Sequence, residues 1–473
     1  MNKPTILFLG RGRRDAMFID TIENLKNKFK IVVLAPNESV ECYKKISGII
    51  VEKNLSYDEL QEACKKVTPE QLAEIPLIED KLGINCYEFN INYLLYRKYV
   101  SRFGAGHIHA FFNDYIPQRL VLDYAMISKL VKKYNVDYAF YETLDLIDTM
   151  IINRMARKGI IKQAFEHMAE SLGGEMRLRL STGQRRDCHK LEYIYNHTKI
   201  SEESVKWAKK AAAIYDQEKP ATPYDSYQAK MGSIIPEITP AKLLDKFKRV
   251  RSGDSFVPTL MKISNRIRST KYFTESLPEG KILSYFLQLT PEASTCSQVP
   301  EYADQEYLIE QIAMHGKYGY TIVVKEHPAC FGNRLPRFYK ELSLLPNVVL
   351  LPKSFPTRDL ILRSEAVIVA TATSPGLESL ATGVPVICFG KPFFNICKNT
   401  YRCETPEQLW DLLAEISYSE DERIKFLAAM HQATYAHPHF DTPEAHELGT
   451  GVGEIMARAL EDEIALYESG ILK

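Results

Sequence analysis

The sequence predicts a doubly wound α/β protein with two domains and a helical C-terminal tail. A chain of 473 residues is longer than one ordinary hydrophobic core can serve. Short apolar runs alternate with amphipathic segments near the N-terminus and again in the third quarter, which is typical of parallel α/β sheets. We expect the two domains at 1–190 and 281–435, a helical and basic connector at 191–280, and C-terminal helices at 436–473.

In the N-terminal domain, buried strands are expected wherever a short apolar run occurs: 5–9, 31–35, 49–51 and 136–141. Amphipathic spacing predicts helices at 15–29, at 56–67 with Ser56 as N-cap, and from about 148 to 158. Residues 85–133 are rich in Tyr, Phe and Leu at mixed spacing, which indicates helices with one long loop. The pattern assigns no element to residues 160–190.

The C-terminal domain repeats this alternation. Strands are expected at 282–287, 320–325, 348–351, 366–370 and 384–389, and helices at 304–315, 375–382, 405–416 and 420–435. The connector carries a helix at 201–216 and then a basic run from Lys242 to Lys271, in which nine Lys or Arg face two Asp, a local excess of 9 − 2 = +7. Such a run is either a solvated helix face or a contact for an anionic lipid surface or a polyanionic glycan.

Composition excludes several classes of function. The formal net charge is zero, so no global field recruits nucleic acid. The nine cysteines form no Cys-x-x-Cys pair, which argues against structural zinc and for a reducing compartment. The apolar run at the N-terminus is too short for a signal peptide, and no window approaches the ~20 apolar residues of a membrane span. We therefore expect a cytoplasmic protein.

The sharpest candidate residues follow the strand at 320–325. Pro328 disfavours helical geometry at His327, so the imidazole is expected in a loop at the carboxyl end of the strand. Ligands bind at that edge of an open α/β sheet. A histidine there can donate to a phosphate oxygen or protonate a leaving group.

A second candidate site opens the helix at 375–382. The Thr371, Thr373 and Ser374 hydroxyls and amides stand where an anion binds at a helix N-terminus, with Ser374 as the expected N-cap. Gly376 would let a ligand approach the backbone. Glu378, one turn into the helix, is expected either to meet ribose hydroxyls or to lie on the solvent face. The alternative is that these groups cap the helix in the ordinary way and bind no ligand.

The N-terminal domain offers candidates that rest on position alone. Arg11, Arg13 and Arg14 lie in the turn after the first strand and could hold an anionic sugar or acceptor. The Gly10-x-Gly12 turn lacks the third glycine of a dinucleotide fingerprint, so NAD is not expected. Glu142 ends the strand at 136–141, where a catalytic carboxylate would stand.

His109 and Asp114 lie in a glycine-rich, aromatic loop that also contains His107, and we interpret this loop as acceptor-binding. His107 and His109 form a His-x-His pair, but no third and fourth ligand follows at a recognisable spacing. No metal and no other cofactor is therefore expected.

Four segments together resemble the bacterial capsule polysaccharide biosynthesis family. They are Tyr-Phe-Leu-Gln-Leu-Thr-Pro-Glu-Ala-Ser-Thr at 285–295, Tyr-Ala-Asp-Gln at 302–305, Val-Lys-Glu-His-Pro at 324–328 and Thr-Ser-Pro-Gly-Leu-Glu-Ser-Leu-Ala-Thr-Gly-Val-Pro-Val at 373–386. That family resembles two-domain GT-B glycosyltransferases, in which two Rossmann-like domains face a cleft. Several members use CMP-activated ulosonic acids such as Kdo, sialic acid or pseudaminic acid.

The resemblance implies a nucleotide-sugar donor and a glycan or glycolipid acceptor. His327, Thr373 and Ser374 would then bind the donor phosphate, and Glu326, Pro291 and Glu292 would line the cytidine or ribose side. The alternatives are a UDP-sugar glycosyltransferase or a UDP-N-acetylglucosamine 2-epimerase-like enzyme on the same architecture, and a non-catalytic component of glycan assembly.

Overall fold

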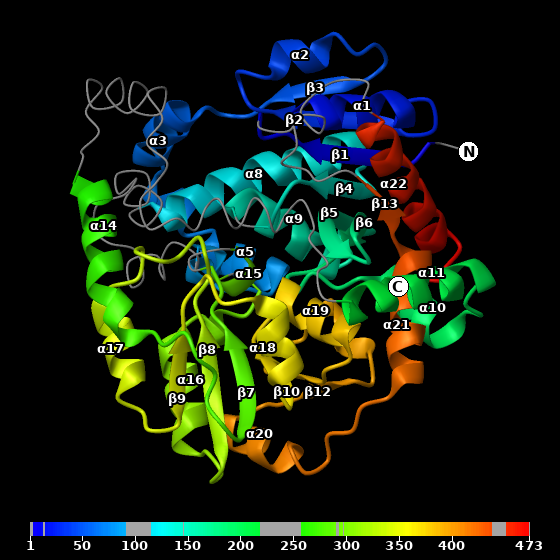
Figure 1. Ribbon diagram of the computed structural model, residues 1–473. Helices are drawn as coiled ribbons and strands as arrows, with labels where there is room; N and C mark the ends of the chain where they lie inside the picture. The colour runs from blue at the N-terminus through cyan, green and yellow to red at the C-terminus, as the bar shows by residue number, and fades with distance from the viewer. Residues whose placement is uncertain are drawn as a thin grey trace, which may run out of the picture. The chain divides into compact units, whose positions relative to one another are not determined.

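The computed structural model divides into two compact units (Figure 1). The first unit takes the described residues up to 210 and from 425 onward, and the second takes those from 211 to 424. The structure describes residues 3–12, 15–90, 115–144, 146–217, 257–289, 293–296, 298–437 and 451–472.

The first unit is built on a sheet in the order β13-β6-β5-β4-β1-β2-β3. Strands β1 to β5 pair in parallel, whereas β6 runs antiparallel to β5, and β13 antiparallel to β6. The strands are β1 (Thr5–Leu9), β2 (Lys30–Ala35), β3 (Ile50–Lys53), β4 (Tyr138–Tyr141), β5 (Gln163–Leu172), β6 (Glu175–Ser181) and β13 (Tyr435–Ala436).

Helices cover both faces of this sheet, and its central strands are correspondingly apolar along most of their length. One face of β1 and β2, with Leu7 and Val32, packs against helices α5 (Ile75–Leu82), α8 (Ile116–Tyr134) and α9 (Ile147–Arg157). The opposite face, with Phe8 and Val33, packs against α1 (Asp15–Leu25) and α22 (Val452–Glu468). Continuous apolar strands with helices on both sides are the mark of a doubly wound domain.

The hairpin of β5 and β6 was not expected from the sequence. Charged residues alternate through it, yet several are buried: Glu166 and Arg179 are each 1% exposed. Arg179 donates two hydrogen bonds to Glu170 across the hairpin, at 3.0 and 2.8 Å. The alternation of Met176, Leu178 and Leu180 along β6 is typical of a strand, whereas the sequence of β5 has no such period because polar residues replace part of the apolar pattern.

The second unit has a wholly parallel sheet in the order β12-β11-β10-β7-β8-β9. The first strand of this unit, β7, lies in the middle; the chain adds β8 and β9 on one side and then β10 to β12 on the other. This is the Rossmann strand order, and it reverses between β7 and β10. The strands are β7 (Lys281–Phe286), β8 (Tyr320–Lys325), β9 (Val348–Leu351), β10 (Ala366–Val369), β11 (Val386–Cys388) and β12 (Thr400–Arg402).

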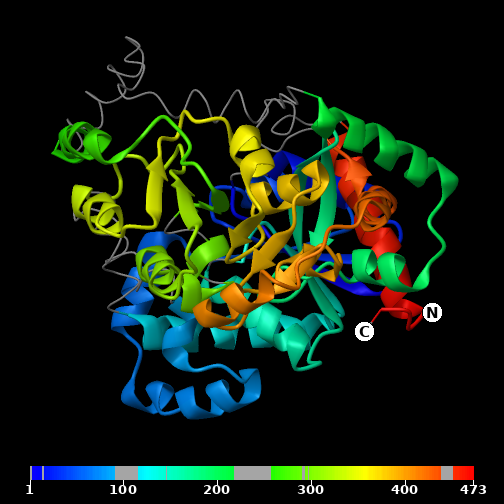
Figure 2. The same cartoon turned by 60° about the horizontal axis from the view of Figure 1, so that its bottom comes forward.

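Helices flank this second sheet as well (Figure 2). Apolar residues of α16 (Gln305–Met314), α17 (Pro336–Ser343) and α20 (Pro406–Leu412) pack against the side chains of alternate strand positions such as Ile322 and Val324. Helices α18 (Thr357–Arg363) and α19 (Ser374–Thr382) pack on each other, α18 against β7 and α19 against β10 and β11. The predicted class, two Rossmann-like doubly wound α/β domains, is confirmed.

The remaining elements are short connections and the segments between and after the sheets. They are α2 (Val40–Lys44), α3 (Tyr57–Lys65), α4 (Pro69–Leu72), η1 (Cys86–Asn90), α10 (His189–His197), α11 (Glu202–Asp216), α14 (Val257–Ser269), η2 (Thr270–Tyr272), α15 (Ala293–Cys296), η3 (Pro300–Tyr302), η4 (Phe393–Ile396) and α21 (Glu420–Ala433). Ser56 caps α3 as predicted, with a full capping box to Glu59.

Candidate functional site

The candidate site of the second unit lies at the carboxyl edge of its sheet, where the strand order reverses between β7 and β10. The chain after β7 reaches Gln288, the chain after β8 holds Glu326 and His327, and the chain after β10 holds Thr371 to Ser374. Strands β8 and β10 are separated only by β7, so their ends stand roughly 10 Å apart. The two predicted motifs are therefore brought to one edge of one sheet.

The segment that opens α19 differs from expectation in which residue caps the helix. Thr373 is the N-cap, and its hydroxyl accepts a hydrogen bond from the Gly376 amide at 3.3 Å. Ser374, predicted as the cap, is instead the first helical residue and is exposed. Pro375 has no amide hydrogen to donate. The Ser374 hydroxyl thus takes no part in capping the helix.

Gly376 and Thr371 are held by packing rather than open to a ligand. A Cβ on Gly376 would lie 2.8 Å from the Phe394 ring, so the absence of a side chain serves the contact with η4. This corrects the interpretation that the glycine clears space for a ligand. Thr371 is buried, and its hydroxyl donates to Gln298 Oε1 at 3.0 Å.

The His327 imidazole is presented with one defined tautomer. Its Nδ1 accepts a hydrogen bond from the Ala329 amide at 3.2 Å, so the proton of the neutral ring lies on Nε2. Burial, together with the positive charges of Arg334 and Lys325, lowers the pKa of His327 to about 4. At neutral pH the ring is therefore an uncharged donor through Nε2.

Glu326 does not line an open surface, contrary to the role expected for it beside cytidine or ribose. Its side chain is 1% exposed. One carboxylate oxygen accepts from the His327 amide at 2.5 Å, and the other accepts from the Tyr339 hydroxyl. The carboxylate is thus committed to internal bonds, and it positions the His-Pro step rather than touching a ligand.

Arg334 and Gln305 complete this buried network. Arg334 was not among the residues predicted from the sequence. Arg334 Nε lies 3.4 Å from Glu326 Oε2, and its Nη2 donates to the Gln288 carbonyl at 2.6 Å. Gln305, from the Tyr-Ala-Asp-Gln segment, donates to the same carbonyl at 3.1 Å and accepts from the Gln288 amide at 2.7 Å. Arg334 therefore joins the end of β8 to the chain after β7, and Gln305 joins that chain to α16.

Lys325, the last residue of β8, was also missed. Its side chain is 6% exposed, and burial lowers its pKa to about 8, against the opposing charges of Glu378 and Glu326. The electrostatic contact with Glu378 joins the end of β8 to the first turns of α19. Glu378 is half-buried and faces this charge, so it does not lie on an open solvent face.

In the first unit, Glu142 follows β4 directly and is half-buried at the carboxyl edge, where it was predicted. Its charge acts on Tyr43, which donates a hydrogen bond to Asp15 at 2.7 Å. Arg11 follows β1 and donates to the Thr143 carbonyl at 3.1 Å. Arg11 thus braces the chain beside Glu142 rather than standing free for an acceptor.

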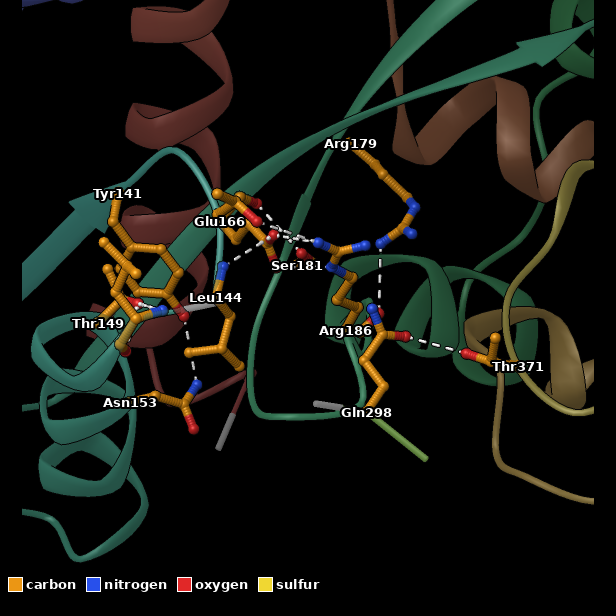
Figure 3. A network of polar contacts seen from close by, with 12 residues as sticks. Tyr141, Leu144, Thr149, Asn153, Glu166, Arg179, Ser181, Arg186, Gln298 and Thr371 are labelled. Atoms are coloured by element: carbon orange, nitrogen blue, oxygen red, sulfur yellow. Dashed lines mark hydrogen bonds and ion pairs between the residues drawn. The ribbon is translucent and has the colours of Figure 1, made fainter. Parts of the chain in front are cut away.

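A buried ion pair also holds the loop that follows β4 (Figure 3). Glu166 on β5 accepts two hydrogen bonds from Arg186, at 2.8 and 2.6 Å, and one from the Leu144 amide at 3.2 Å. Asn153 donates to the Tyr141 hydroxyl at 3.3 Å, which ties α9 to the end of β4. Neither Glu166 nor Arg186 was predicted, because the hairpin that carries them was not.

Several predicted residues lie outside the described residues: Arg13, Arg14, His109, Asp114, Pro291 and Glu292, together with the basic run up to residue 256. Of the described part of that run, Arg266 is buried and donates to the Phe331 carbonyl at 2.8 Å, which removes it from any lipid contact. Arg268 and Lys271 are exposed. Within the described ranges, no three His, Cys, Asp or Glu side chains gather as a metal site requires.

The sequence comparison agrees with the segments that suggested the family. The family described as capsule polysaccharide biosynthesis protein matches residues 190–411, just under half of the chain. Residues 190–411 are thus similar to this family. The match includes His327, Lys325, Arg334 and the start of α19. The predicted resemblance to the capsule polysaccharide biosynthesis family is confirmed. No curated protein matches the chain significantly.

Several solved structures resemble the chain distantly. The β-Kdo 2,7-transferase KpsC of Thermosulfurimonas dismutans is 13% identical, with 72% of this chain and 89% of that chain covered at a TM-score of 0.39. The β-Kdo 2,4-transferase KpsC of the same organism is 15% identical, with 63% of this chain and 80% of that chain covered at a TM-score of 0.37. HepE of Anabaena in complex with UDP-glucose is 12% identical, with 97% of this chain and 99% of that chain covered at a TM-score of 0.30. Likenesses this distant carry no argument of their own, so the fold assignment rests on the two sheets.

Proposed function

We propose that the chain is a glycosyltransferase of surface polysaccharide biosynthesis that transfers an ulosonic acid from a CMP-activated donor to a glycan or glycolipid acceptor. One observation carries this proposal. His327 and the N-terminus of α19 stand at the carboxyl edge of a Rossmann-ordered sheet, on either side of its central strand β7, within the residues that match the capsule family. An uncharged N–H donor and a helix N-terminus on one sheet edge suit a phosphate group.

The proposed reaction needs charge stabilisation at the phosphate. The bond between the anomeric carbon of the sugar and the phosphate oxygen breaks, and its electron pair stays on that oxygen, so CMP leaves. The acceptor hydroxyl oxygen forms the new bond to the anomeric carbon and gives up its proton. The phosphate thereby changes from a diester with one negative charge to a monoester approaching two, which favours donors arranged around it.

His327 is proposed to donate its Nε2 hydrogen to the departing phosphate oxygen. The hydrogen bond from Ala329 to Nδ1 keeps that hydrogen on Nε2. Because the pKa of His327 is lowered to about 4 by burial, the neutral ring acts as a hydrogen-bond donor at neutral pH.

Glu142 is proposed to accept the proton of the acceptor hydroxyl. It is a half-buried carboxylate that directly follows a strand, in a loop held by Arg11 and by the Glu166–Arg186 pair. Such support keeps a catalytic group in a fixed geometry. The sugar carboxylate would need a cation, for which Arg13 and Arg14 remain predictions.

Calorimetric titration with CMP and with UDP tests the donor assignment. We expect CMP to bind and UDP to bind more weakly. If UDP binds and CMP does not, the ulosonic-acid donor is wrong, and the alternative of a UDP-sugar glycosyltransferase or a UDP-N-acetylglucosamine 2-epimerase-like enzyme replaces it. If neither nucleotide binds, the non-catalytic assembly component is favoured.

We further propose peripheral contact with the inner face of a membrane through the exposed part of the basic run. Arg268 and Lys271 are exposed near Leu260 and Ile267, two aliphatic side chains that are 64% and 65% exposed on α14. Cations beside exposed aliphatic groups suit an anionic lipid surface. No helix within the described ranges is long and apolar enough to cross a membrane. Co-sedimentation with vesicles containing or lacking anionic lipid tests the contact, and equal binding to both would contradict it.

A further inference from the structure

Lys325 stands apart among the buried charges of the second unit. It is 6% exposed, yet within the described part of the chain its ammonium has no hydrogen-bond or ion-pair partner. The buried Arg334, in contrast, reaches both Glu326 and the Gln288 carbonyl. The side chain is buried along its length, but its ammonium is not among the fully enclosed polar atoms of the described residues. Such an ammonium is available to an anionic ligand, and a largely buried charge in a protein is normally paired.

The position of Lys325 in the sheet fixes the side on which that ligand lies. Side chains alternate along a strand, and Ile322 and Val324 face the cluster with α16, α17 and α20. Lys325 therefore points to the opposite face. The carboxylate of Glu378 on α19 opposes the lowering of the Lys325 pKa more than that of Glu326 does, which agrees with an ammonium on the α19 side of the sheet.

Three donors of different kinds thus lie at the carboxyl edge of the second sheet. They are the His327 Nε2 hydrogen, the exposed Ser374 hydroxyl and the Lys325 ammonium. Glu378 and Glu326 are the carboxylates whose charges act on the lysine. Glu326 is already engaged by Tyr339, Arg334 and the His327 amide.

We propose that Lys325 is the cation that binds the phosphate of the nucleotide donor and stabilises the nucleoside monophosphate as it leaves. This inference rests on the proposed function, since it assigns one more residue to the same donor site. The charge of the phosphate grows as the bond to the sugar breaks, so a fixed cation lowers the energy of the transition state more than that of the bound donor.

Titration calorimetry with three probes tests this assignment. Wild type, Lys325→Met and Lys353→Met would each be titrated at pH 7 with CMP, cytidine and inorganic phosphate. Lys353 is the matched control, because it follows the neighbouring strand β9 and burial also lowers its pKa to about 8. We expect Lys325→Met to weaken CMP binding roughly 10- to 100-fold, as loss of a charged hydrogen bond does, and to leave cytidine binding unchanged. Lys353→Met should change neither.

The outcomes distinguish failure of the Lys325 assignment from failure of the proposed function. If Lys325→Met binds CMP as tightly as wild type does, Lys325 is not the phosphate cation, and the proposed donor stands. If wild type binds CMP no more tightly than cytidine, the donor-phosphate site and the role of Lys325 are both wrong. If wild type binds inorganic phosphate as well as CMP, a free anion site replaces the nucleotide site. If UDP binds instead of CMP, the donor assignment fails, and the same comparison with UDP and uridine tests Lys325 alone.

Thermal melting of the ligand-free variants guards against a structural explanation. Replacing a buried, unpaired ammonium with an apolar side chain should leave the melting temperature equal or higher. Lys325→Gln, which keeps the side-chain length and removes the charge, serves as the second variant if Lys325→Met does not fold. A clear loss of stability in both variants would show that Lys325 is paired within the fold and would overturn the proposal.

Discussion

At the scale of single residues, the site combines one neutral and one charged donor, separated by one residue of the same segment. His327 donates through Nε2, and Lys325, two residues earlier on β8, carries a buried ammonium. Glu326 between them faces the interior and anchors the segment. Alternation along the strand end thus divides the Lys-Glu-His sequence into an inner anchor and two outward-directed functional groups.

The first prediction concerns His327. His327→Ala should slow hydrolysis of a CMP-sugar by the purified protein about 10²- to 10³-fold, because one preorganised donor to the leaving group is lost. His315→Ala, at the exposed end of α16, is the control and should hydrolyse the donor at the wild-type rate. Equal hydrolysis by His327→Ala and wild type would remove His327 from the mechanism.

The second prediction concerns pH. Since burial lowers the pKa of Lys325 to about 8, the side chain is charged below pH 8 and loses its proton above it. CMP affinity, measured by calorimetry, should therefore fall as the pH rises from 8 to 9.5. His327, with a pKa near 4, stays neutral throughout this window, and the facing carboxylates of Glu378 and Glu326 are the other charges at hand.

Lys325→Arg supplies the matched comparison, because an arginine stays charged across this range. If Lys325→Arg binds CMP, its affinity for CMP should stay constant up to pH 9.5. If the wild-type protein also keeps constant affinity over this range, the titrating group is not Lys325.

Residue-level prediction from the sequence succeeded where a neighbour restricts the backbone. Pro328 and the end of an apolar run were enough to place His327 at the sheet edge. Lys325 was missed because a lysine that ends a strand is usually solvent-exposed, and burial is a property of the whole domain. Ser374 was taken for the cap because Thr373 and Ser374 have equivalent capping hydroxyls, and only the backbone geometry separates them.

At the scale of elements, two neighbouring hydroxyls at the N-terminus of α19 have different roles, one in helix stability and one in the proposed ligand binding. Thr373 caps the helix, whereas the Ser374 hydroxyl is exposed and unused by the cap. Thr373→Ala should therefore destabilise the second unit by about 1 kcal/mol in denaturant unfolding. Ser374→Ala should leave stability unchanged within about 0.5 kcal/mol and should weaken CMP binding. The reverse pattern would show that the roles of these two hydroxyls are exchanged.

The network that joins the ends of β7 and β8 makes a further prediction. Glu326→Gln leaves the buried guanidinium of Arg334 without its carboxylate and should cost about 3–5 kcal/mol of unfolding free energy. The double variant Glu326→Gln with Arg334→Met should recover part of this loss, because no unpaired charge then remains. A loss below about 1 kcal/mol in the single variant would contradict the role assigned to the pair.

Element prediction was reliable for the apolar parallel strands and failed for the β5–β6 hairpin. The central residues of strands such as β1, β8 and β10 are apolar because they are buried on both faces of the sheet. In β5 and β6, partners such as Glu166 with Arg186 satisfy charges in the interior. A pairing between residues distant in sequence cannot be read from hydrophobic periodicity, so the residues that brace the Glu142 loop were missed with the hairpin.

At the scale of the whole molecule, the C-terminal helix belongs to the first unit. Helix α22 packs against α1, and Lys28 pairs with Glu461 at 2.7 Å. The Tyr138 hydroxyl also donates to Glu468 at 2.6 Å. The sequence predicted a helical tail but not its partner, because amphipathic spacing shows that a helix buries one face and leaves the covering element open.

Gly453 tests this integration. A Cβ there would lie 2.2 Å from the Asp20 Cβ and 2.6 Å from the Thr21 nitrogen, so Gly453→Ala should destabilise the first unit by about 1–3 kcal/mol. Each unit contains one of the two tryptophans, Trp207 in the first and Trp410 in the second. The fluorescence of Trp207, measured in a Trp410→Phe background, should report the loss, and Trp410 in a Trp207→Phe background should not.

Glu454→Gln, at the exposed neighbouring position, is the control for this variant and should unfold as wild type does. If Gly453→Ala lowers the stability of the second unit by the same amount, the tail does not belong to the first unit alone.

The central claim is that the carboxyl edge of the second sheet binds the phosphate of a CMP-activated donor. A crystal structure with CMP bound tests it most directly. The account predicts a phosphate within hydrogen-bond distance of His327 Nε2, the Ser374 hydroxyl and the Lys325 ammonium. CMP bound elsewhere, or bound with its phosphate in contact with none of these three groups, would contradict it.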